Sequence, residues 1–328
     1  MSAEKTLINK ICDDFYSITL PMPFRLRHVH VYALVDGNDV ALFDTGFNTS
    51  DSFARLEMAL DSIGLGIKSI RQIYLTHVHA DHCGMAGIIK GKSGATIHLS
   101  RAGDESNQNY YNTDLLAAQM RKFYMRHGMT EKEVENLIVM FGGLRHIISE
   151  FKGDYLLEHG EICRFGKWQF QAIFTPGHSN GHMCFFFPEG KFLISGDTVL
   201  PQITPNLSPD IVVEDFRPLH SFLVSLDEVD KLPVENIYPG HGNPFGNLPA
   251  RTAEMRLHHR ERSGIVLNCV KEKPKTAYLI AKEVFGEDLQ EFDRFLALNE
   301  AYVHLLELKI KGAVKEEIRG ANLVYRTS

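Results

Sequence analysis

The sequence predicts a layered α/β fold, in which helices cover β-sheets. Two observations lead to this prediction. Over roughly the first 245 residues, short apolar runs typical of strands alternate with longer segments that carry apolar residues at helical spacing. After Pro249 the strand-like runs stop, and amphipathic helical patterns continue to a strand-like pair at the end of the chain. Interspersed strands and helices favour sheets with helices packed on their faces.

The first part of the chain predicts three successive strands. They cover the segments FYSITL, VHVYALVD and VALFDTG, and Gly37-Asn38 supplies a turn between the last two. Ser50 then begins a helical pattern, DSFARLEMALDSIG, which Gly64 ends. A strand at IRQIYLT, a helix at GMAGIIK and a strand at ATIHLS follow.

The second half of the chain repeats this alternation. We expect strands at WQFQAIFT, HMCFFFP, KFLISG and ENIYP, with a helix at PLHSFLVSLDEVDKL before the last of them. Between the halves, residues 101–154 predict a helical insertion, because LLAAQMRKFYMRH carries an apolar stripe and Thr130 with Glu133 forms a capping box. We place a first, larger domain at residues 1–248. Residues 249–328 form a second domain, whose three helices and terminal hairpin suggest a winged helix.

The composition is that of an ordinary soluble globular protein. The 328 residues, 44% of them hydrophobic and 23% charged, suit one large domain and a small one. The net charge of −6 argues against an electrostatic hold on nucleic acid or an anionic membrane. The N-terminus lacks the pattern of a secretory signal, and no apolar stretch is long enough to span a bilayer. Five scattered cysteines without a CxxC pair favour reduced thiols, so we expect a cytoplasmic protein.

The segment THVHADHCG, residues 76–84, concentrates side chains that bind metals. His77 and His79 lie two apart on an extended segment, so a bend can aim both at one ion. Asp81 and His82 follow the bend and can face a second ion. Two ions need six ligands or more, so other parts of the chain must contribute. Alternatively, the segment is only a polar loop after a strand.

Three later motifs supply the missing donors. TPGHSNGH offers His178, SGDT offers Asp197 and PGHG offers His241, and each donor follows a predicted strand with glycine nearby. Loops at strand ends converge at one edge of a sheet. The ordered set of four motifs therefore favours a metal site over four unrelated polar loops.

These motifs, together with DTG at Asp44, resemble the metallo-β-lactamase superfamily over roughly residues 14–245. The resemblance implies a four-layered αβ/βα sandwich with a two-metal site at the edge between its sheets. Zinc is the usual metal in that family, although iron and manganese also occur. The resemblance implies seven ligands: His77, His79 and His178 for one ion, Asp81, His82 and His241 for the other, and Asp197 as a bridge between them.

The same resemblance implies roles for residues around the ligands. Asp44 would orient a ligand histidine from behind, and we expect His182 to form hydrogen bonds close to the ligands instead of binding metal. Two ions about 3.5–4 Å apart would share a hydroxide that attacks the substrate. Asp81 and Asp197 are the predicted catalytic residues, because they offset metal charge and Asp81 could orient this nucleophile. Cys83 and Cys184 are expected to be packed thiols.

The fold alone does not choose among the hydrolases of this family, which include β-lactamases, thioesterases such as glyoxalase II, lactonases, nucleases and sulfatases. The bridging Asp197 resembles the glyoxalase and lactonase types, whereas β-lactamases lack it. The nucleases usually carry large extra domains or basic tracts. Residues 249–328 contain 14 Lys and Arg against 12 Asp and Glu, which is a poor electrostatic footprint for RNA.

The combination of a lactamase-like domain, a helical insertion and a winged-helix-like tail resembles a subgroup that contains acyl-thioester hydrolases and an endoribonuclease. We favour an acyl thioester of CoA, carrier-protein or glutathione type, with a lactone or RNA as alternatives. The insertion would form a lid over the acyl group through Tyr110, Tyr111, Leu116, Met120, Phe123, Tyr124 and Met125. Alternatively, this stripe packs on the sandwich or forms a homodimer contact. Arg256, Arg260 and Arg262 could meet CoA phosphates or form a solvated helix face.

Two functions outside the hydrolases would use the same features. A di-iron redox protein of related ligand pattern would need a flavin domain, and no such segment is visible in the sequence. A DNA-binding module would use the winged helix and carry a vestigial metal site. The complete ligand set and the near-neutral tail argue against this second alternative.

Overall fold

The strands of the N-terminal half build a seven-stranded sheet. The computed structural model describes residues 8–22 and 26–328, and its first seven strands follow one another across this sheet in sequence order. Neighbours from β1 to β4 pair antiparallel, whereas those from β4 to β7 pair in parallel. The strands are β1 (Ile8–Cys12), β2 (Phe15–Pro21), β3 (His28–Asp36), β4 (Asp39–Phe43), β5 (Ile70–Tyr74), β6 (Thr96–Ser100) and β7 (Tyr155–Leu157).

A five-stranded sheet packs face to face on the first one. Its order is β12-β11-β10-β9-β8, with β11 and β12 parallel and the other neighbours antiparallel. Aromatic side chains from both sheets meet between them, and the rings of the buried Phe43 and Phe185 lie 5.1 Å apart. The strands are β8 (Ile162–Phe165), β9 (Trp168–Phe174), β10 (Met183–Phe187), β11 (Phe192–Gly196) and β12 (Asn236–Pro239).

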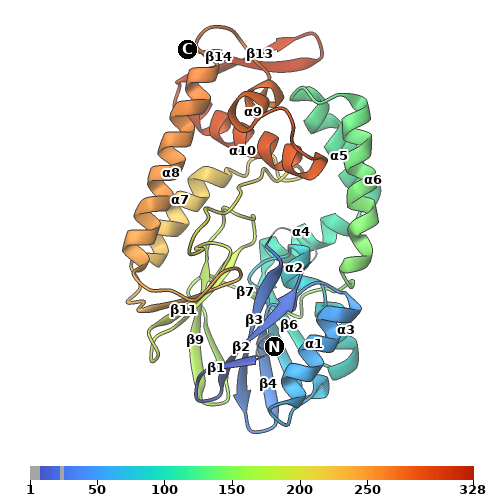
Figure 1. Cartoon of the computed structure of the whole chain (residues 1–328), viewed down its shortest axis with the longest axis vertical. Helices are drawn as coiled ribbons and strands as arrows, with labels where there is room; N and C mark the ends of the chain where they lie inside the picture. Colours follow the sequence, from blue (N-terminus) through green and yellow to red (C-terminus); the bar gives the residue numbers. More distant parts are fainter. Residues whose placement is uncertain (1–7, 23–25) are drawn as a thin grey trace, which may run out of the picture.

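Helices cover the outer faces of both sheets (Figure 1). Two helices pack on the seven-stranded sheet through buried side chains that include Leu56 and Ile89. Another helix packs on the five-stranded sheet through Phe222. The helices of this part are α1 (Ser50–Asp61), η1 (Ile67–Ser69), α2 (Ala80–Cys83), α3 (Ala86–Ser93) and α7 (Pro218–Val229). The order of helix, sheet, sheet and helix confirms the expected four-layered αβ/βα sandwich.

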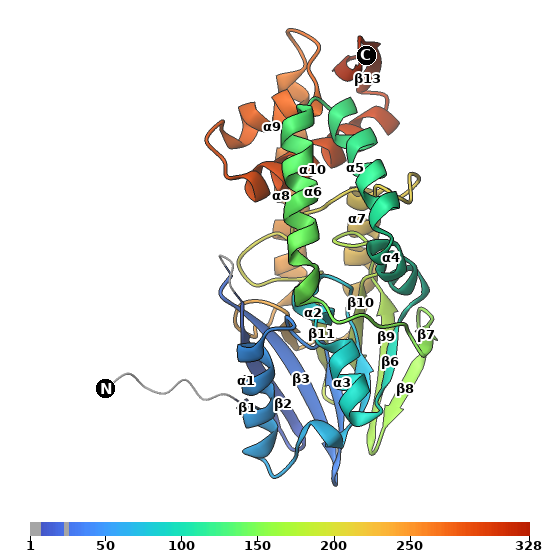
Figure 2. The ribbon, with the colours of Figure 1, turned by 90° about the vertical axis from the view of Figure 1, so that its right-hand side faces the viewer.

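Helices form the insertion that the sequence predicts at residues 101–154. They lie between β6 and β7 in the chain and rise from the sandwich toward the C-terminal helices (Figure 2). The predicted capping box is present, because the Thr130 side chain accepts from the Glu133 amide and the Glu133 carboxylate accepts from the Thr130 amide. The helices are α4 (Arg101–Tyr111), α5 (Thr113–Arg126), α6 (Glu131–Gly143) and η2 (Leu144–Ile147).

The chain after β12 forms helices and a terminal hairpin, as the sequence predicts. The insertion and this C-terminal part share one hydrophobic core, in which α5 and α6 pack against α8, α9 and α10. The winged-helix-like character and the domain boundary at residue 248 stay predictions from the sequence. The elements are α8 (Leu248–Cys269), α9 (Ala277–Phe285), α10 (Glu291–Ile310), β13 (Val314–Arg319) and β14 (Asn322–Thr327).

The apolar stripe of the insertion contributes to this shared core. Met120 and Tyr124 are 3% and 2% exposed, and the Tyr124 hydroxyl donates to Oδ1 of Asn299 on α10 at 3.1 Å. The interpretation of these two side chains as a lid over an acyl group is therefore wrong, because they hold the insertion to the C-terminal helices. Because both side chains are buried within one chain, they do not offer a surface for a contact between two copies of it. Phe123 differs, since it is only half-buried at the edge of the core.

Deletion of residues 249–328 is expected to give aggregated or unfolded protein. Val134 and Leu137 of α6, now 0% and 1% exposed, would face water, and burial of one such side chain contributes about 1.5–3 kcal/mol. In the full chain, Leu298→Ala should lower the free energy of unfolding by about 2–5 kcal/mol, and the half-exposed Leu279→Ala by much less. Size-exclusion chromatography and thermal unfolding check both results. A monomeric truncated protein with the wild-type Tm would contradict the shared core.

Four expectations from the sequence concern the chain as a whole. Within the described residues, no helix combines the length and apolar character needed to cross a bilayer. All five cysteines are free thiols. The interpretation of the N-terminus as lacking a secretory signal falls partly on residues 1–7, which lie outside the described residues. The cytoplasmic location stays a prediction.

Candidate metal centre

Four loops bring the predicted donors together at one edge of the sandwich. Each loop follows a strand: β5 leads into the HVHADH segment, and β9, β11 and β12 lead to His178, Asp197 and His241. Strands that end on the same side of two packed sheets deliver the residues after them to one place. Helix α2, which carries Asp81 and His82, lies at the end of the sandwich that faces the C-terminal helices (Figure 1).

Three histidines form the first group of donors. Nδ1 of His79 lies 2.9 Å from Nε2 of His77 and 2.9 Å from Nε2 of His178. Zinc–nitrogen bonds of about 2.0–2.1 Å place two imidazole nitrogens about 3.3 Å apart in a tetrahedral site. Side-chain movements of a few tenths of an ångström would therefore let all three histidines bind one ion.

Asp81, His82 and His241 form the second group. Their donor atoms all lie within 4.8 Å of one another. Oδ2 of Asp81 is 3.2 Å from Nε2 of His241 and 3.7 Å from Nε2 of His82. One carboxylate with two imidazoles is a donor set that suits zinc, iron and manganese.

Asp197 lies between the two groups. Its Oδ2 is 3.6 Å from Nε2 of His178 in the first group and 3.5 Å from Nε2 of His241 in the second. Its Oδ1 is 3.5 Å from Nε2 of His82. One carboxylate thus reaches donors of both groups, which is the position that a bridging ligand needs.

Two atoms at the centre are buried without a hydrogen-bond partner. They are Nε2 of His82 and Oδ1 of Asp197. A buried polar group left unpaired costs about 1–3 kcal/mol, and more if it is charged. A cation bound between these atoms would satisfy both, so the residues present fit a divalent metal ion.

Asp44 supports both groups from behind. Its Oδ2 lies 2.8 Å from Nδ1 of His82, and its Oδ1 accepts from the Thr76 amide at 2.7 Å. The Thr76 hydroxyl donates to Asp44 Oδ2 at 2.8 Å and lies 3.0 Å from Nδ1 of His77. Asp44 itself has a φ of +60°, which non-glycine residues rarely adopt. These contacts turn Nε2 of both histidines toward the centre.

Two main-chain carbonyl groups orient further donors. Nδ1 of His178 donates to the Asn206 carbonyl at 2.9 Å, and Nδ1 of His241 donates to the His28 carbonyl at 2.9 Å. Each bond keeps the proton on Nδ1 and leaves Nε2 free to bind an ion. Main-chain carbonyls carry no side-chain pattern, so sequence analysis could not have found them.

His182 contacts the residue that bridges the groups. Its Nε2 accepts a hydrogen bond from the Asp197 amide at 3.1 Å. Its Nδ1 lies 2.9 Å from the hydroxyls of both Thr175 and Thr198. Because both ring nitrogens are engaged, His182 holds the main chain of Asp197 in place and is not itself a donor to the centre.

Burial and charge shift the pKa values at the centre in opposite directions. Burial lowers the pKa of His77 well below its usual value, which keeps this imidazole in the neutral form that binds metals. Burial also lowers the pKa of His241, but Asp197 and Asp81 outweigh it and raise that pKa to about 10. Burial raises the pKa of Asp81, but His82 and His241 lower it to about 2. A metal ion that binds the second group must therefore displace a proton.

The family profile of the Metallo-beta-lactamase superfamily matches residues 25–241, which is more than half of the chain and contains all seven donors. The chain belongs to the metallo-beta-lactamase superfamily. Its fold is one that typically binds divalent metal ions, in keeping with the donor groups at the sheet edge. The chain is thus a metallo-hydrolase of the β-lactamase fold.

Similar proteins span nearly the whole chain. The probable metallo-hydrolase YqjP of Bacillus subtilis (strain 168) is 25% identical, over 96% of this chain and 98% of that protein. An atrochrysone carboxyl ACP thioesterase of Passalora fulva is 24% identical, over 89% of this chain and 73% of that protein. The crystal structure of a metallo-beta-lactamase family protein from Thermus thermophilus superposes with a TM-score of 0.86 and 27% identity, over 97% of this chain and 100% of that one.

Two of the predicted substrate residues lie at the end of α4. The rings of Tyr110 and Tyr111 are 5.8 Å apart at the end of α4. The Tyr111 hydroxyl donates to the Ser149 carbonyl at 3.4 Å, and the Ser149 hydroxyl donates to the Gly84 carbonyl at 2.7 Å. Gly84 follows His82 by two residues, so Ser149 links Tyr111 to the segment that carries Asp81 and His82.

Arg256 does not offer a free guanidinium group to a substrate phosphate. Its Nη2 lies 2.6 Å from Oδ1 of Asp227 and 2.9 Å from Oδ2 of Asp230, both near the end of α7. The interpretation of Arg256 as a CoA-phosphate contact is therefore corrected: this residue ties α8 to α7. Arg260 is exposed one turn further along α8 and stays a predicted contact.

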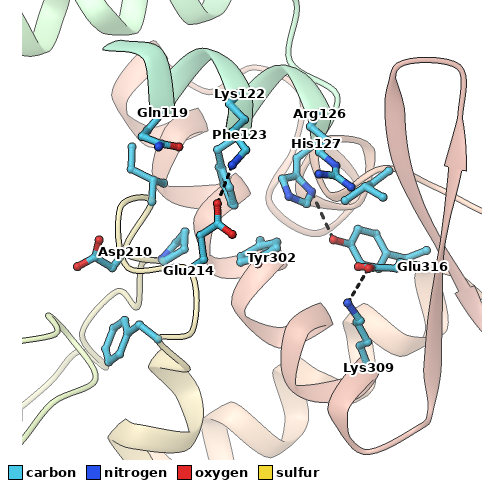
Figure 3. Close-up of a pocket in the computed structure, with 15 residues that line it drawn as sticks. Gln119, Lys122, Phe123, Arg126, His127, Asp210, Glu214, Tyr302, Lys309 and Glu316 are labelled. Atoms are coloured by element: carbon cyan, nitrogen blue, oxygen red, sulfur yellow. Dashed lines mark hydrogen bonds and ion pairs between the residues drawn. The ribbon is translucent and has the colours of Figure 1, made fainter. Parts of the chain in front are cut away.

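A pocket of about 270 Å³ lies where α5 meets the C-terminal part, and the seven donors are not among its lining residues (Figure 3). Phe123 forms one wall, with its ring 4.8 Å from that of Tyr302. Asp210 on another wall follows Asn206 by four residues, which is at most about 14 Å of chain. Because the Asn206 carbonyl holds His178, a single loop borders both the pocket and the metal centre.

Proposed function

We propose that this protein is a two-metal hydrolase that cleaves an acyl thioester of CoA, carrier-protein or glutathione type. The position of Asp197 between the two donor groups is the observation that carries the two-metal part. The proposed ions are zinc, with iron and manganese as alternatives, because all seven proposed ligands are imidazoles or carboxylates. The proposed ligands are His77, His79 and His178, then Asp81, His82 and His241, with Asp197 shared.

The side chains of the centre would divide the work of hydrolysis. Two divalent ions held there would activate water and take up the negative charge that develops on the substrate carbonyl. Asp197 and Asp81 would offset part of the metal charge. Asp81, whose pKa is about 2, is ionised at neutral pH and can accept a hydrogen bond from water, which would orient it toward the carbonyl. Asp44 and His182 would keep these groups in place.

A thioester suits this centre because its leaving group needs no strong acid. A thiol has an ordinary pKa of about 8.5, so a thiolate departs readily near neutral pH. The carboxyl groups of Asp81 and Asp197 both have lowered pKa values. They are therefore ionised and cannot protonate a poorer leaving group. A relative described as an ACP thioesterase supports the same substrate class.

The proposed acyl-binding surface comprises Phe123 with Tyr110 and Tyr111. The loop from Asn206 to Asp210 leads from the metal centre to the pocket that Phe123 lines. An acyl chain that extends from the centre along this loop would reach an aromatic wall. Arg260 remains a proposed contact for a charged carrier, since no ion pair of the described residues engages it.

A panel of substrates tests the proposal. We expect purified protein to hydrolyse acyl-CoA, carrier-protein or glutathione thioesters with a higher kcat/KM than lactones or RNA. The negative net charge makes RNA the weakest candidate on electrostatic grounds. Faster cleavage of a lactone or RNA than of every thioester would overturn the thioester assignment and leave the metal chemistry standing.

Phe123→Ala is expected to weaken the use of long or aromatic acyl thioesters. One buried aromatic contact contributes about 1.5–3 kcal/mol, or roughly 10- to 150-fold in affinity. Hydrolysis of a small activated ester should be nearly unchanged, because that substrate does not reach the pocket. Phe141→Ala is the matched control, since Phe141 packs on Phe295 in the same core with its ring 5.1 Å away. Equal loss for long and small substrates would show that Phe123 is only structural.

A further inference from the structure

A second cluster of metal-binding side chains lies away from the sheet edge, where α8 packs against α10. His258 and His259 come from α8, and Glu300 comes from α10. One donor atom from each lies within 4.8 Å of the other two. None of these residues belongs to the seven donors of the metallo-hydrolase centre, and none of the motifs of that centre includes them.

His259 is buried without a partner for either ring nitrogen. The residue is 2% exposed, and neither Nδ1 nor Nε2 makes a hydrogen bond. The ring of Phe222 lies 5.3 Å away on α7, and the ring of His304 lies 5.5 Å away on α10. Burial lowers the pKa of His259 to about 4, so the imidazole is neutral and has a lone pair without a partner. An unpaired buried group of this kind points to a missing ligand.

Glu300 places a negative charge beside this imidazole. The residue is 6% exposed. Burial raises its pKa, but the hydrogen bond with His304 and other neighbours lower it below the usual value, so the carboxylate is ionised at neutral pH. Nε2 of His304 lies 3.2 Å from Oε1, and the Leu207 amide donates to Oε2 at 3.4 Å. Nδ1 of His304 in turn lies 2.8 Å from the Ser263 hydroxyl. The carboxylate is therefore oriented by neighbours, as metal-binding carboxylates commonly are.

The geometry points to a third metal site, in which a divalent transition-metal ion of the zinc type is bound by His258, His259 and Glu300 and links α8 to α10. Two imidazoles and one carboxylate are a common zinc donor set, and a water molecule can complete the tetrahedron. Bonds of about 2.0–2.2 Å require donor atoms roughly 3.3 Å apart. The three donor atoms lie within 4.8 Å of one another, so they need to approach by at most about 1.5 Å. His258 is only half-buried and provides the route by which an ion enters.

The third site would act on structure and not on the reaction. Glu300 also accepts a hydrogen bond from the Leu207 amide, and the carbonyl of the neighbouring Asn206 orients His178 of the catalytic centre. An ion on Glu300 would therefore stiffen the loop that joins the two sites. We expect its loss to lower thermal stability, with a smaller effect on activity.

Metal counting in the full-length protein separates the sites. Metal-free protein is incubated with excess Zn²⁺, desalted and analysed for bound metal. We expect close to three ions per chain in the wild type and one ion fewer in His259→Ala. The variant His79→Ala/Asp197→Ala, which lacks one donor of the first group and the shared carboxylate, should retain one ion, and adding Glu300→Gln to it should remove that ion. This background makes the result independent of the proposed hydrolase function.

Two further variants keep the experiment decisive. Glu300→Gln preserves the shape of the side chain and an acceptor for the Leu207 amide, so it should fold and still lose the third ion. His220→Ala removes an exposed histidine of α7 and should bind as much metal as the wild type. In the His79→Ala/Asp197→Ala background, Zn²⁺ should raise the Tm, and adding Glu300→Gln should abolish that rise.

The opposite results would overturn the third site. If the His79→Ala/Asp197→Ala variant binds no metal, the partner of His259 is a water molecule. The same conclusion follows if Glu300→Gln and His259→Ala both bind as many ions as the wild type.

Discussion

Replacing Asp197 by alanine is expected to remove metal and hydrolytic activity together. Among the described residues, Asp197 is the carboxylate that lies close to donors of both groups, with Oδ2 3.6 Å from His178 Nε2 and 3.5 Å from His241 Nε2. Partners that merely orient a ligand contribute roughly 10- to 100-fold to metal affinity or activity. Loss of the bridging ligand itself should therefore lower kcat/KM by more than about 100-fold.

Metal analysis and kinetics on the same sample check this result. Asp215→Ala is the matched control, because Asp215 is an exposed carboxylate in the segment that follows β11. It should keep the metal content and activity of the wild type. An Asp197→Ala protein that retains both bound ions and full activity would show that Asp197 is not a ligand.

Replacing Gly240 by alanine is expected to have the second large effect. A Cβ at this position would lie 2.6 Å from Oδ1 of Asp197 and 2.6 Å from Cε1 of His82. Both distances are shorter than any ordinary van der Waals contact, so at least one of the two donors must move. Metal-binding geometries tolerate displacements of only about 0.5 Å. We expect the variant to fold, with a metal affinity and kcat/KM reduced by at least about 10-fold.

Gly264→Ala on α8 is the matched control for this substitution. A Cβ at Gly264 would meet no atom within 4 Å, and alanine favours a helix interior by roughly 0.5–1 kcal/mol over glycine. Its metal content should equal that of the wild type, and its Tm should be equal or higher. Wild-type metal affinity in Gly240→Ala would mean that His82 and Asp197 do not bind ions in the positions described.

Much of the sandwich could be predicted because its central strands are strongly apolar. β10 is buried at all five positions, and such runs stand out in the sequence. The segments β1 and β8 were not predicted, because they are edge strands. INKIC has no buried position, and ICRF has only two, Cys163 and Phe165, so neither segment forms the apolar run that marks a central strand.

The insertion shows a different limit of sequence patterns. An apolar stripe on a helix predicts that one face is buried, but it does not say against what. Met120 and Tyr124 face the C-terminal helices instead of a substrate, because the partner surface comes from residues more than 140 positions away in the chain. Phe123, their neighbour, lines the pocket of Figure 3.

At the metal centre, residue type decided what could be predicted. Histidines and aspartates that follow predicted strands can be recognised in a sequence as candidate metal ligands. The structure brings all seven predicted donors together. The contacts behind them are less visible. The Asn206 and His28 carbonyls belong to the main chain, and the position of Thr76 at the start of the first motif does not reveal its contact with His77. His259 and Glu300 lie about 40 residues apart without any shared motif, so only the fold joins them.

Titration of metal-free protein with Zn²⁺ tests the central claim most directly. The Glu300→Gln variant is used, so that ions bound at the third site do not disturb the count. We expect no thioester hydrolysis without metal. Hydrolytic activity should return fully once two ions per chain are bound, because two groups of donors share Asp197. Full activity in the metal-free protein, or full recovery at one ion, would contradict a two-metal hydrolase.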